Sequence, residues 1–222
     1  MAKQVIAFDL DDTLYKEIDF VKSGYQAVLN ELSKKYSINT NHILKKMLNS
    51  DNAFNSLLND IKSEYSEAKE NIDWCLNIYR EHIPNITLSQ DTYDTIIKLY
   101  NQSIPLCIIT DGRTITQANK INSLGLYKLI DPEYILISEN IGKDKFSSTA
   151  FEILMSFFSK NTEFVYIGDN THKDFLWPNK LGWKTICIKD NGMNIHPQNF
   201  QCPIEYKPHF IVNNLSDILQ LI

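Results

Sequence analysis

The 222-residue chain has only four cysteines, seven glycines and seven prolines, and it lacks a long apolar run. The cysteines (Cys75, Cys107, Cys187 and Cys202) form neither a Cys-x-x-Cys pair nor a Cys/His cluster, which argues against a structural zinc site. Two of them lie inside apolar, strand-like runs, so buried and reduced thiols are expected. Apolar runs such as residues 105–109 are far too short to cross a membrane.

The chain also lacks a strong charge of either sign. It has 22 Lys and Arg against 27 Asp and Glu, and no block rich in Lys and Arg stands out. A nucleic-acid-binding surface is therefore not expected. The N-terminal apolar stretch is too short for a signal peptide, which favours a cytoplasmic location. At 43% hydrophobic residues, the chain can form one α/β domain, or a core with a small inserted domain.

Most of the chain alternates between short apolar runs and helical patterns. Helices are predicted from a Ser89 cap through Tyr100, from a Thr114 cap through Leu124, and over residues 147–158. In the first of these helices, the face expected to be apolar holds Tyr93, Ile96, Ile97 and Tyr100. The predicted buried strands cover residues 5–8, 104–110, 134–138, 164–167, 185–188 and 209–212. This alternation predicts a parallel sheet covered by helices on both faces.

The segment from about residue 19 to residue 84 breaks the alternation. It holds no strand-like run but several helical patterns, and the first of these patterns comprises Val21, Tyr25, Val28, Leu32 and Tyr36. A helical insertion of this length, placed just after the first strand, is expected to form a separate small bundle.

Acidic residues follow two of the predicted strands. Asp9 and Asp11 follow the first strand, and their carboxylates are expected to crowd together because alternate residues of an extended chain point the same way. Asp169 follows another strand, and ligands bind at the carboxyl ends of parallel strands. Clustered carboxylates need a proton or a cation between them, and Mg²⁺ suits oxygen ligands and phosphate. For Asp9 and Asp11 alone, capping of a turn or helix is an equally good interpretation.

Two further elements are typical of a phosphate site. Thr110 ends a predicted strand, and the turn at Asp111 and Gly112 presents backbone N–H groups near a helix start. Lys143 and Lys145 lie on the loop after the third strand, where a lysine can neutralise a nucleophile and a phosphate. Each element alone is weak, since such turns are common and a loop lysine is usually solvated.

Taken in this order, these elements resemble the motifs of the haloacid dehalogenase-like (HAD) superfamily. The first motif, DxDx[TV], is matched by Asp9, Asp11 and Thr13. The second, a Thr or Ser at the end of the next core strand, is matched by Thr110, and the fourth, GDxxxxD, by residues 168–174. The first and fourth motifs, correctly spaced around a strand that ends in threonine, form a specific signal.

The third motif of the superfamily is a lysine, and Lys145 fits it best. The chain has Lys145-Phe146 where the superfamily usually has Lys-Pro, so Lys143 stays a second candidate. The resemblance covers nearly the whole chain and identifies it as similar to the phosphatase branch of the superfamily.

The resemblance also implies the architecture. The core is expected to be an α/β, Rossmann-like, three-layer parallel sheet, with the fifth, fourth, first, second and third strands in spatial order. Residues 1–16 and 87–222 would form this core, and residues 17–86 would form an all-helical cap. The interval between the third and fourth strands is too short for the alternative, later cap.

In the mechanism that the resemblance implies, Asp9 attacks phosphorus and carries the phosphoryl group. Asp11 protonates the leaving group and then deprotonates the hydrolytic water. Mg²⁺ is expected on Asp9, the backbone carbonyl of Asp11, and Asp169, with Asp174 orienting a ligand or a water from behind. The phosphate oxygens are expected to contact Thr110, the amides of Asp111 and Gly112, and Lys145.

Other reactions stay open. Dehalogenases of the superfamily lack an acid at the position of Asp11, but phosphomutases have one. Phosphonatases use a lysine of the cap, for which Lys16, Lys22 and Lys34 are candidates. A non-catalytic relative that binds phosphate or regulates a partner is a further alternative.

The expected substrate is a small phosphomonoester, either a sugar phosphate or a nucleoside monophosphate. The candidate substrate contacts are Tyr15, Lys16, Phe20, Arg113 and His172. For Phe20 the alternative is packing within the cap, and for the last two it is a solvated surface position. The sequence does not predict the oligomeric state.

Overall fold

The computed structural model describes residues 3–222, and the chain divides into two compact units. The core unit comprises the residues up to Ile18 together with Thr87–Ile222, and the helical unit comprises Asp19–Ile86. Among the described residues, no helix combines the length and apolar character needed to span a bilayer. Each unit has its own apolar core, so the two are described separately.

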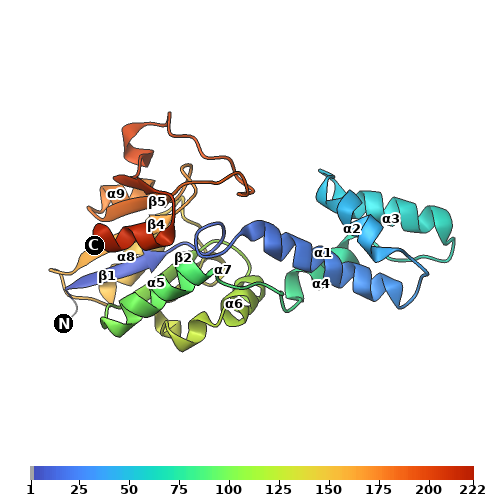
Figure 1. The fold of residues 1–222 in the computed structure, drawn as a ribbon, viewed down its shortest axis with the longest axis horizontal. Coiled ribbons are helices and arrows are strands. Elements are labelled where there is room, and N and C mark those ends of the chain that lie inside the picture. The colour runs from blue at the N-terminus through green and yellow to red at the C-terminus, as the bar shows by residue number, and fades with distance from the viewer. Residues whose placement is uncertain (1–2) are drawn as a thin grey trace. The chain divides into compact units, whose positions relative to one another are not determined.

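The core unit is built on a six-stranded parallel sheet in the order β3-β2-β1-β4-β5-β6 (Figure 1). The strands are β1 (Gln4–Phe8), β2 (Leu106–Thr110), β3 (Ile135–Ile137), β4 (Glu163–Gly168), β5 (Lys184–Ile188) and β6 (Phe210–Val212). This order confirms the Rossmann-like α/β fold, and β6 extends the sheet beyond the fifth strand. The order along the chain reverses between β1 and β4, so the carboxyl ends of these central strands form the edge where open parallel sheets bind ligands.

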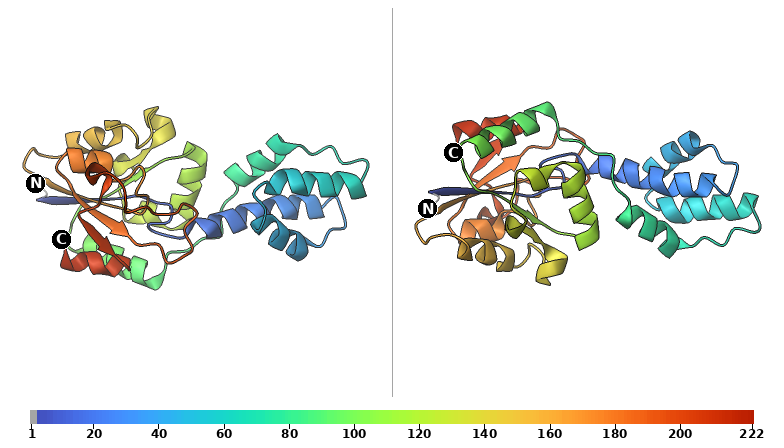
Figure 2. Two further views of the ribbon diagram at one scale, coloured as in Figure 1. Left: turned by 90° about the horizontal axis from the view of Figure 1, so that it is seen from above. Right: turned by 90° about the horizontal axis from the view of Figure 1, so that it is seen from below.

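Helices cover both faces of the sheet, as predicted. The core-unit helices are α5 (Gln90–Asn101), α6 (Thr114–Ser123), α7 (Ser138–Ile141), α8 (Thr149–Ser156) and α9 (Leu176–Lys180), with 3-10 turns η1 (Leu126–Lys128), η2 (Pro132–Tyr134), η3 (Ile204–Tyr206) and η4 (Leu215–Gln220). Figure 2 shows α5 and η4 side by side on one face, with α8 and α9 on the opposite face. On the α8 side, Phe151 packs edge-on against Tyr166 and Trp183 within one apolar cluster.

The boundaries of α5 are confirmed, but its predicted apolar face is right for Ile96 and wrong for the two tyrosines. Ser89 caps the helix by accepting a hydrogen bond from the Thr92 backbone N–H (3.1 Å). Tyr93 and Tyr100 are each 48% exposed. The buried stripe is instead formed by Thr92, Thr95, Ile96 and Leu99. Buried threonines are tolerated because their hydroxyls can bond within the helix, as Thr95 does to the Asp91 carbonyl (2.7 Å).

The last strand was predicted as buried, but β6 lies at the edge of the sheet. Phe210 is 41% and Ile211 is 49% exposed, because β6 pairs only with β5. Burial of the cysteines is confirmed for Cys107 and Cys187.

The helical unit consists of four α-helices around a core of its own. They are α1 (Glu17–Ser33), whose first residues belong to the core unit, α2 (Thr40–Leu48), α3 (Ala53–Glu64) and α4 (Ile72–Glu81). Their apolar faces bury residues such as Val28, Leu57 and Cys75 in one cluster. Gly24 of α1 is required by packing, since an added Cβ would lie 2.4 Å from the Tyr79 ring.

Candidate active site

The site is assembled where β1, β2 and β4 end. In the register of the sheet, Phe8 pairs with Ile108 on one side and with Ile167 on the other. The next residue, Asp9, donates its backbone N–H to the Ile167 carbonyl (2.8 Å). The backbone hydrogen bonds between β1 and β4 therefore continue up to Asp9. Asp169 follows β4, and both carboxylates are nearly buried, at 5% and 3% exposed. Adjacent strand ends therefore bring together side chains that are 160 positions apart in the sequence.

Three buried carboxylates meet at this edge. Single ligand oxygens of Asp9, Asp169 and Asp174 all lie within 4.8 Å of one another. Burial raises the pKa of Asp9 to about 7, against the opposing charge of Lys145. Burial, followed by the charges of Asp174 and Asp9, raises the pKa of Asp169 to about 9. A hard divalent cation would favour the ionised forms, so the donor set fits Mg²⁺ in charge and in chemistry.

Asp174 is held rigidly by the turn after β4. Its Oδ2 atom accepts hydrogen bonds from the backbone N–H groups of Asp169 (3.2 Å) and Asn170 (2.9 Å). Gly168 makes this turn possible, because an added Cβ would lie 2.5 Å from Asp174 Oδ2. The spacing of the GDxxxxD motif thus folds its second aspartate back onto the first.

Lys145, and not Lys143, lies in the site. Its Nζ is 2.7 Å from Asp9 Oδ1 and 2.6 Å from Asp174 Oδ1, and the residue is 1% exposed. Its backbone N–H donates to the Asp111 carboxylate (3.0 Å), which fixes the loop against the end of β2. Lys143 is an exposed residue of the same loop. The chain therefore places a fully buried cation against the proposed nucleophile.

The end of β2 matches the expected phosphate cradle only in part. Thr110 is 1% exposed, and its hydroxyl accepts a hydrogen bond from Gln117 Nε2 (2.6 Å). Gly112 adopts a φ of 146°, a conformation that favours glycine. Its backbone N–H already donates to Ser138 Oγ (2.9 Å), and Gly112 does not line the cavity described below. Asp111 does line it, with its carboxylate 2.9 Å from Lys173 Nζ.

Asp11 is surrounded by donors rather than by the other carboxylates. Its Oδ1 lies 2.7 Å from Lys120 Nζ and accepts the Tyr15 hydroxyl, while Oδ2 accepts from Gln117 Nε2 (2.9 Å). Burial would raise the pKa of Asp11, but the ion pair and hydrogen bonds outweigh burial and lower that pKa. The side chain of Asp11 therefore points to donors of its own and does not belong to the three-carboxylate cluster.

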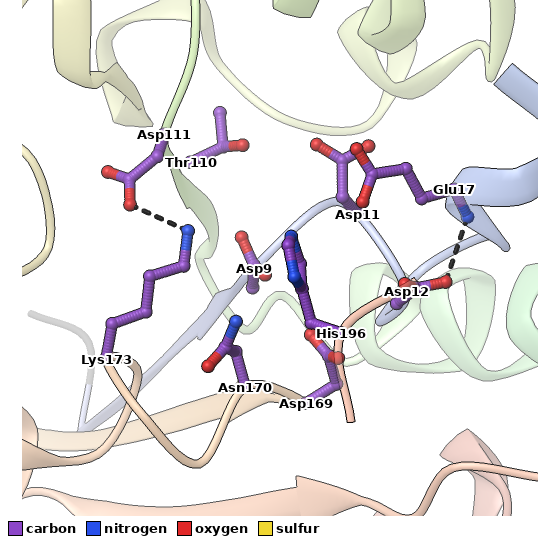
Figure 3. Close-up of a pocket in the computed structure, with 10 residues that line it drawn as sticks. All are labelled: Asp9, Asp11, Asp12, Glu17, Thr110, Asp111, Asp169, Asn170, Lys173 and His196. Atoms are coloured by element: carbon purple, nitrogen blue, oxygen red, sulfur yellow. Dashed lines mark hydrogen bonds and ion pairs between the residues drawn. The ribbon is translucent and has the colours of Figure 1, made fainter. Parts of the chain in front are cut away.

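Some of these residues line a cavity of about 220 Å³ (Figure 3). The lining consists of Asp9, Asp11, Asp12, Glu17, Thr110, Asp111, Asp169, Asn170, Lys173 and His196. Asp9 lies in the middle of the labelled side chains, and Lys173 reaches toward Asp111 beside it. The lining thus presents the Asp9 carboxylate and the Lys173 ammonium to the same cavity, an arrangement that can receive a phosphate group.

Sequence reasoning missed several residues of this site. Gln117 and Lys120 are three positions apart on α6, so they share a helix face, but nothing in the sequence indicates that this face meets Asp11. Lys173 lies inside the fourth motif and could have been suspected from that position. His196 comes from a loop without a recognisable pattern. That loop is tied to the site by Asn194, whose Nδ2 donates to Asp169 Oδ2 (2.8 Å).

The candidate substrate contacts are dispersed. Arg113 and His172 are exposed and do not line the cavity, and the His172 ring instead packs edge-on against Phe146 (5.8 Å between centroids). Lys16 donates to Asn194 Oδ1 (2.7 Å) at the rim. Phe20 is 3% exposed within the helical unit, where its ring contacts Tyr79 and His82, which favours the packing alternative. The remaining candidate, Tyr15, donates its hydroxyl to the Asp11 carboxylate, as described above.

Comparison with known proteins gives one consistent result. The family described as haloacid dehalogenase-like hydrolase matches residues 6–188. The chain is 30% identical to a glyceraldehyde 3-phosphate phosphatase of Methanocaldococcus jannaschii over 193 residues, covering 82% of this chain and 83% of that protein. It is 27% identical to the protein of the same name in Methanothermobacter thermautotrophicus, covering 83% and 85%.

Solved structures show the same fold. The magnesium-bound HAD hydrolase YfnB of Bacillus subtilis superposes with a TM-score of 0.63 at 20% identity, over 100% of this chain and 99% of that one. A HAD phosphatase from Thermococcus onnurineus gives a TM-score of 0.63 at 18% identity, over 98% and 97%.

Proposed function

Because the chain belongs to the haloacid dehalogenase-like hydrolases and is a phosphatase of that family, we propose that it hydrolyses a small sugar phosphate through a phosphoryl group carried on Asp9, with Mg²⁺ as cofactor. The observation that carries the proposal is the position of Asp9. Asp9 lines a polar cavity, and its carboxylate lies 2.7 Å from the buried ammonium of Lys145. A buried cation beside a nucleophile favours its ionised form and offsets the charge of an incoming phosphate.

The proposed reaction has two chemical steps. In the first, an oxygen of Asp9 attacks phosphorus, the bond to the ester oxygen breaks, and the leaving oxygen takes a proton from Asp11. In the second, Asp11 takes a proton from water, and that water attacks the phosphorus of the aspartyl-phosphate. The bond from phosphorus to Asp9 then breaks, which releases inorganic phosphate and regenerates the free carboxylate.

The metal would be held by the three-carboxylate cluster. Asp9 and Asp169 would supply oxygen donors, and the backbone carbonyl of Asp11 is the further donor expected from the motif. Asp174, expected to act from behind these ligands, has an oxygen close enough to them to be an additional donor. When bound, Mg²⁺ supplies positive charge beside the phosphoryl oxygens. Asn194 orients Asp169 through its hydrogen bond, and the two backbone amides orient Asp174, so both carboxylates are fixed before a ligand arrives.

Two observations favour a sugar phosphate over a nucleotide. The curated relatives named above are phosphatases of glyceraldehyde 3-phosphate, a three-carbon sugar phosphate. Within the described core unit, the cavity lining contains acidic, amide, hydroxyl, lysine and histidine side chains but no Phe, Tyr or Trp. Such a lining is rich in hydrogen-bonding groups for hydroxyls, and the His196 imidazole is its one ring among the described residues, so it suits a sugar better than a nucleobase.

The test is a substrate panel measured at saturating Mg²⁺. Glyceraldehyde 3-phosphate, pentose phosphates and hexose phosphates are compared with nucleoside monophosphates by release of inorganic phosphate. We expect the highest kcat/KM among the sugar phosphates. A nucleoside monophosphate that exceeds every sugar phosphate would overturn the substrate class, and absence of phosphate release from the entire panel would overturn the proposed activity.

Lys145→Ala is expected to reduce kcat/KM much more than Lys143→Ala. Loss of the ammonium group beside Asp9 should cost roughly 2 to 4 kcal/mol of transition-state stabilisation, by analogy with other preorganised donors. Lys143 is the matched control, because it is exposed and lies two positions away on the same loop. Circular dichroism is needed in parallel, since removing Lys145 leaves two buried carboxylates without their cation. A greater loss in the folded Lys143 variant would reassign the site lysine.

A further inference from the structure

Asp11 is held by three donors that belong to no recognised motif. Lys120 Nζ and the Tyr15 hydroxyl bond to Oδ1, and Gln117 Nε2 bonds to Oδ2. Gln117 also donates to the hydroxyl of Thr110, so a single side chain joins the proton-transfer group to the end of β2. Both oxygens of the Asp11 carboxylate are therefore fixed in place.

The two donors on α6 are buried side chains, and the helix that carries them is anchored at its start. Gln117 is 1% and Lys120 is 3% exposed. The start of α6 is anchored on α7, because the Thr114 backbone N–H donates to Glu139 Oε2 (2.7 Å) and its hydroxyl to Asn140 Oδ1 (2.6 Å). A helix pinned at its first turn and packed along its length can hold a side chain more precisely than a loop can.

The burial of Lys120 also needs an explanation. Taking a lysine and a carboxylate out of water is expensive, and a buried ion pair usually adds little net stability compared with apolar residues of the same volume. Lys120 does not line the cavity, whereas its partner Asp11 does. Its ion pair with Asp11 connects it to the reaction through the orientation of that carboxylate.

We infer that Lys120 and Gln117 are positioning residues that hold Asp11 in the orientation needed for proton transfer to the leaving group and from water. The inference rests on the proposed function, because it assumes that Asp11 transfers protons in both chemical steps. Since a displacement of about 1 Å can cost 100-fold in rate, loosening this carboxylate should slow both steps. The attack of Asp9 on phosphorus itself transfers no proton to or from Asp11.

The rate loss caused by a loosened Asp11 should therefore depend on the leaving group. The phenolate of 4-nitrophenyl phosphate is stable without a proton, whereas the alkoxide of a sugar phosphate needs one to leave. In a Lys120→Met variant, formation of the aspartyl-phosphate from the aryl ester should stay within a few-fold of wild type. Its hydrolysis, which needs Asp11 as a base, should slow by roughly 10- to 100-fold.

The experiment is rapid-mixing kinetics on the full-length, Mg²⁺-loaded protein. With 4-nitrophenyl phosphate, Lys120→Met should give a burst of one nitrophenolate per enzyme followed by slow turnover, or a larger burst than wild type shows. With glyceraldehyde 3-phosphate, single-turnover phosphate release should slow by at least as much as the steady state of the aryl ester. Lys128→Met, at an exposed position just after α6, is the matched control and should behave as wild type.

Two further variants keep the inference falsifiable if Lys120→Met is unstable. Lys120→Arg retains a cation near Asp11 and should recover part of the lost rate, and Gln117→Met should produce the same burst to a smaller degree. Equal slowing of both chemical steps in folded variants, without a burst and without rescue by arginine, would overturn the positioning role. If the wild-type protein itself releases no phosphate, it is the proposed function that fails.

Discussion

Asp9→Asn is expected to lower kcat by at least ~10³-fold, because an uncharged amide cannot attack phosphorus and no covalent intermediate can form. The fold should survive, since asparagine has the same shape and Lys145 keeps its second partner, Asp174, at 2.6 Å. The measurement is steady-state phosphate release with glyceraldehyde 3-phosphate and 4-nitrophenyl phosphate, together with a thermal melt.

The matched control is Asp51→Asn, which makes the same chemical change at an exposed position of the helical unit. It should retain wild-type turnover. If a well-folded Asp9→Asn protein kept more than about a hundredth of the wild-type rate, covalent catalysis by Asp9 would be contradicted, since loss of a nucleophile commonly removes several orders of magnitude.

Removal of divalent metal should abolish turnover, and added Mg²⁺ should restore it. The physical reason is the cluster of Asp9, Asp169 and Asp174. Burial raises the pKa of Asp9 and Asp169, and the ion pairs of Lys145 with Asp9 and Asp174 offset only part of the negative charge of the cluster. Dialysis against EDTA followed by titration with Mg²⁺ and assay of phosphate release measures this dependence directly.

A binding measurement separates a metal site from an indirect effect on activity. Mg²⁺ should raise the melting temperature of the wild-type protein, because a ligand that binds only the native state stabilises it. In Asp169→Asn the shift should shrink or vanish, since one of three clustered donors is lost. Full activity in excess EDTA, or an unchanged thermal shift in this variant, would contradict the proposed site.

The sequence predicted the parts of the site that follow from strand ends. Apolar runs located β1, β2 and β4, and each ends directly before or at a polar residue, so Asp9, Thr110 and Asp169 had to meet once the strands paired. Lys145 was predicted as the site lysine from its place between the second and fourth motifs, and the structure places its ammonium against Asp9. Local patterns are sufficient here because neighbouring parallel strands align their ends.

The remaining parts depend on packing that no local pattern encodes. The predicted apolar face of α5 was wrong at Tyr93 and Tyr100, because Thr92 and Thr95 are buried instead and the tyrosine rings stay half-exposed. The contact of Gln117 and Lys120 with Asp11 depends on how α6 is rotated against the loop after β1. Hydrophobic periodicity does not predict that rotation. His196 lies on a loop whose path is fixed by tertiary hydrogen bonds, such as that from the Ile195 backbone N–H to Asp12 (2.9 Å).

The most direct test of the account is the location of the phosphoryl group during turnover. An Asp11→Asn variant, in which hydrolysis of the intermediate should be slowed, is mixed with substrate and Mg²⁺, quenched in acid, digested and analysed by mass spectrometry. The account predicts a single added phosphate on Asp9, absent when Asp9→Asn is combined with the first change. Phosphate on any other residue, or turnover by the variant without a trapped phosphopeptide in repeated quenches, would contradict it.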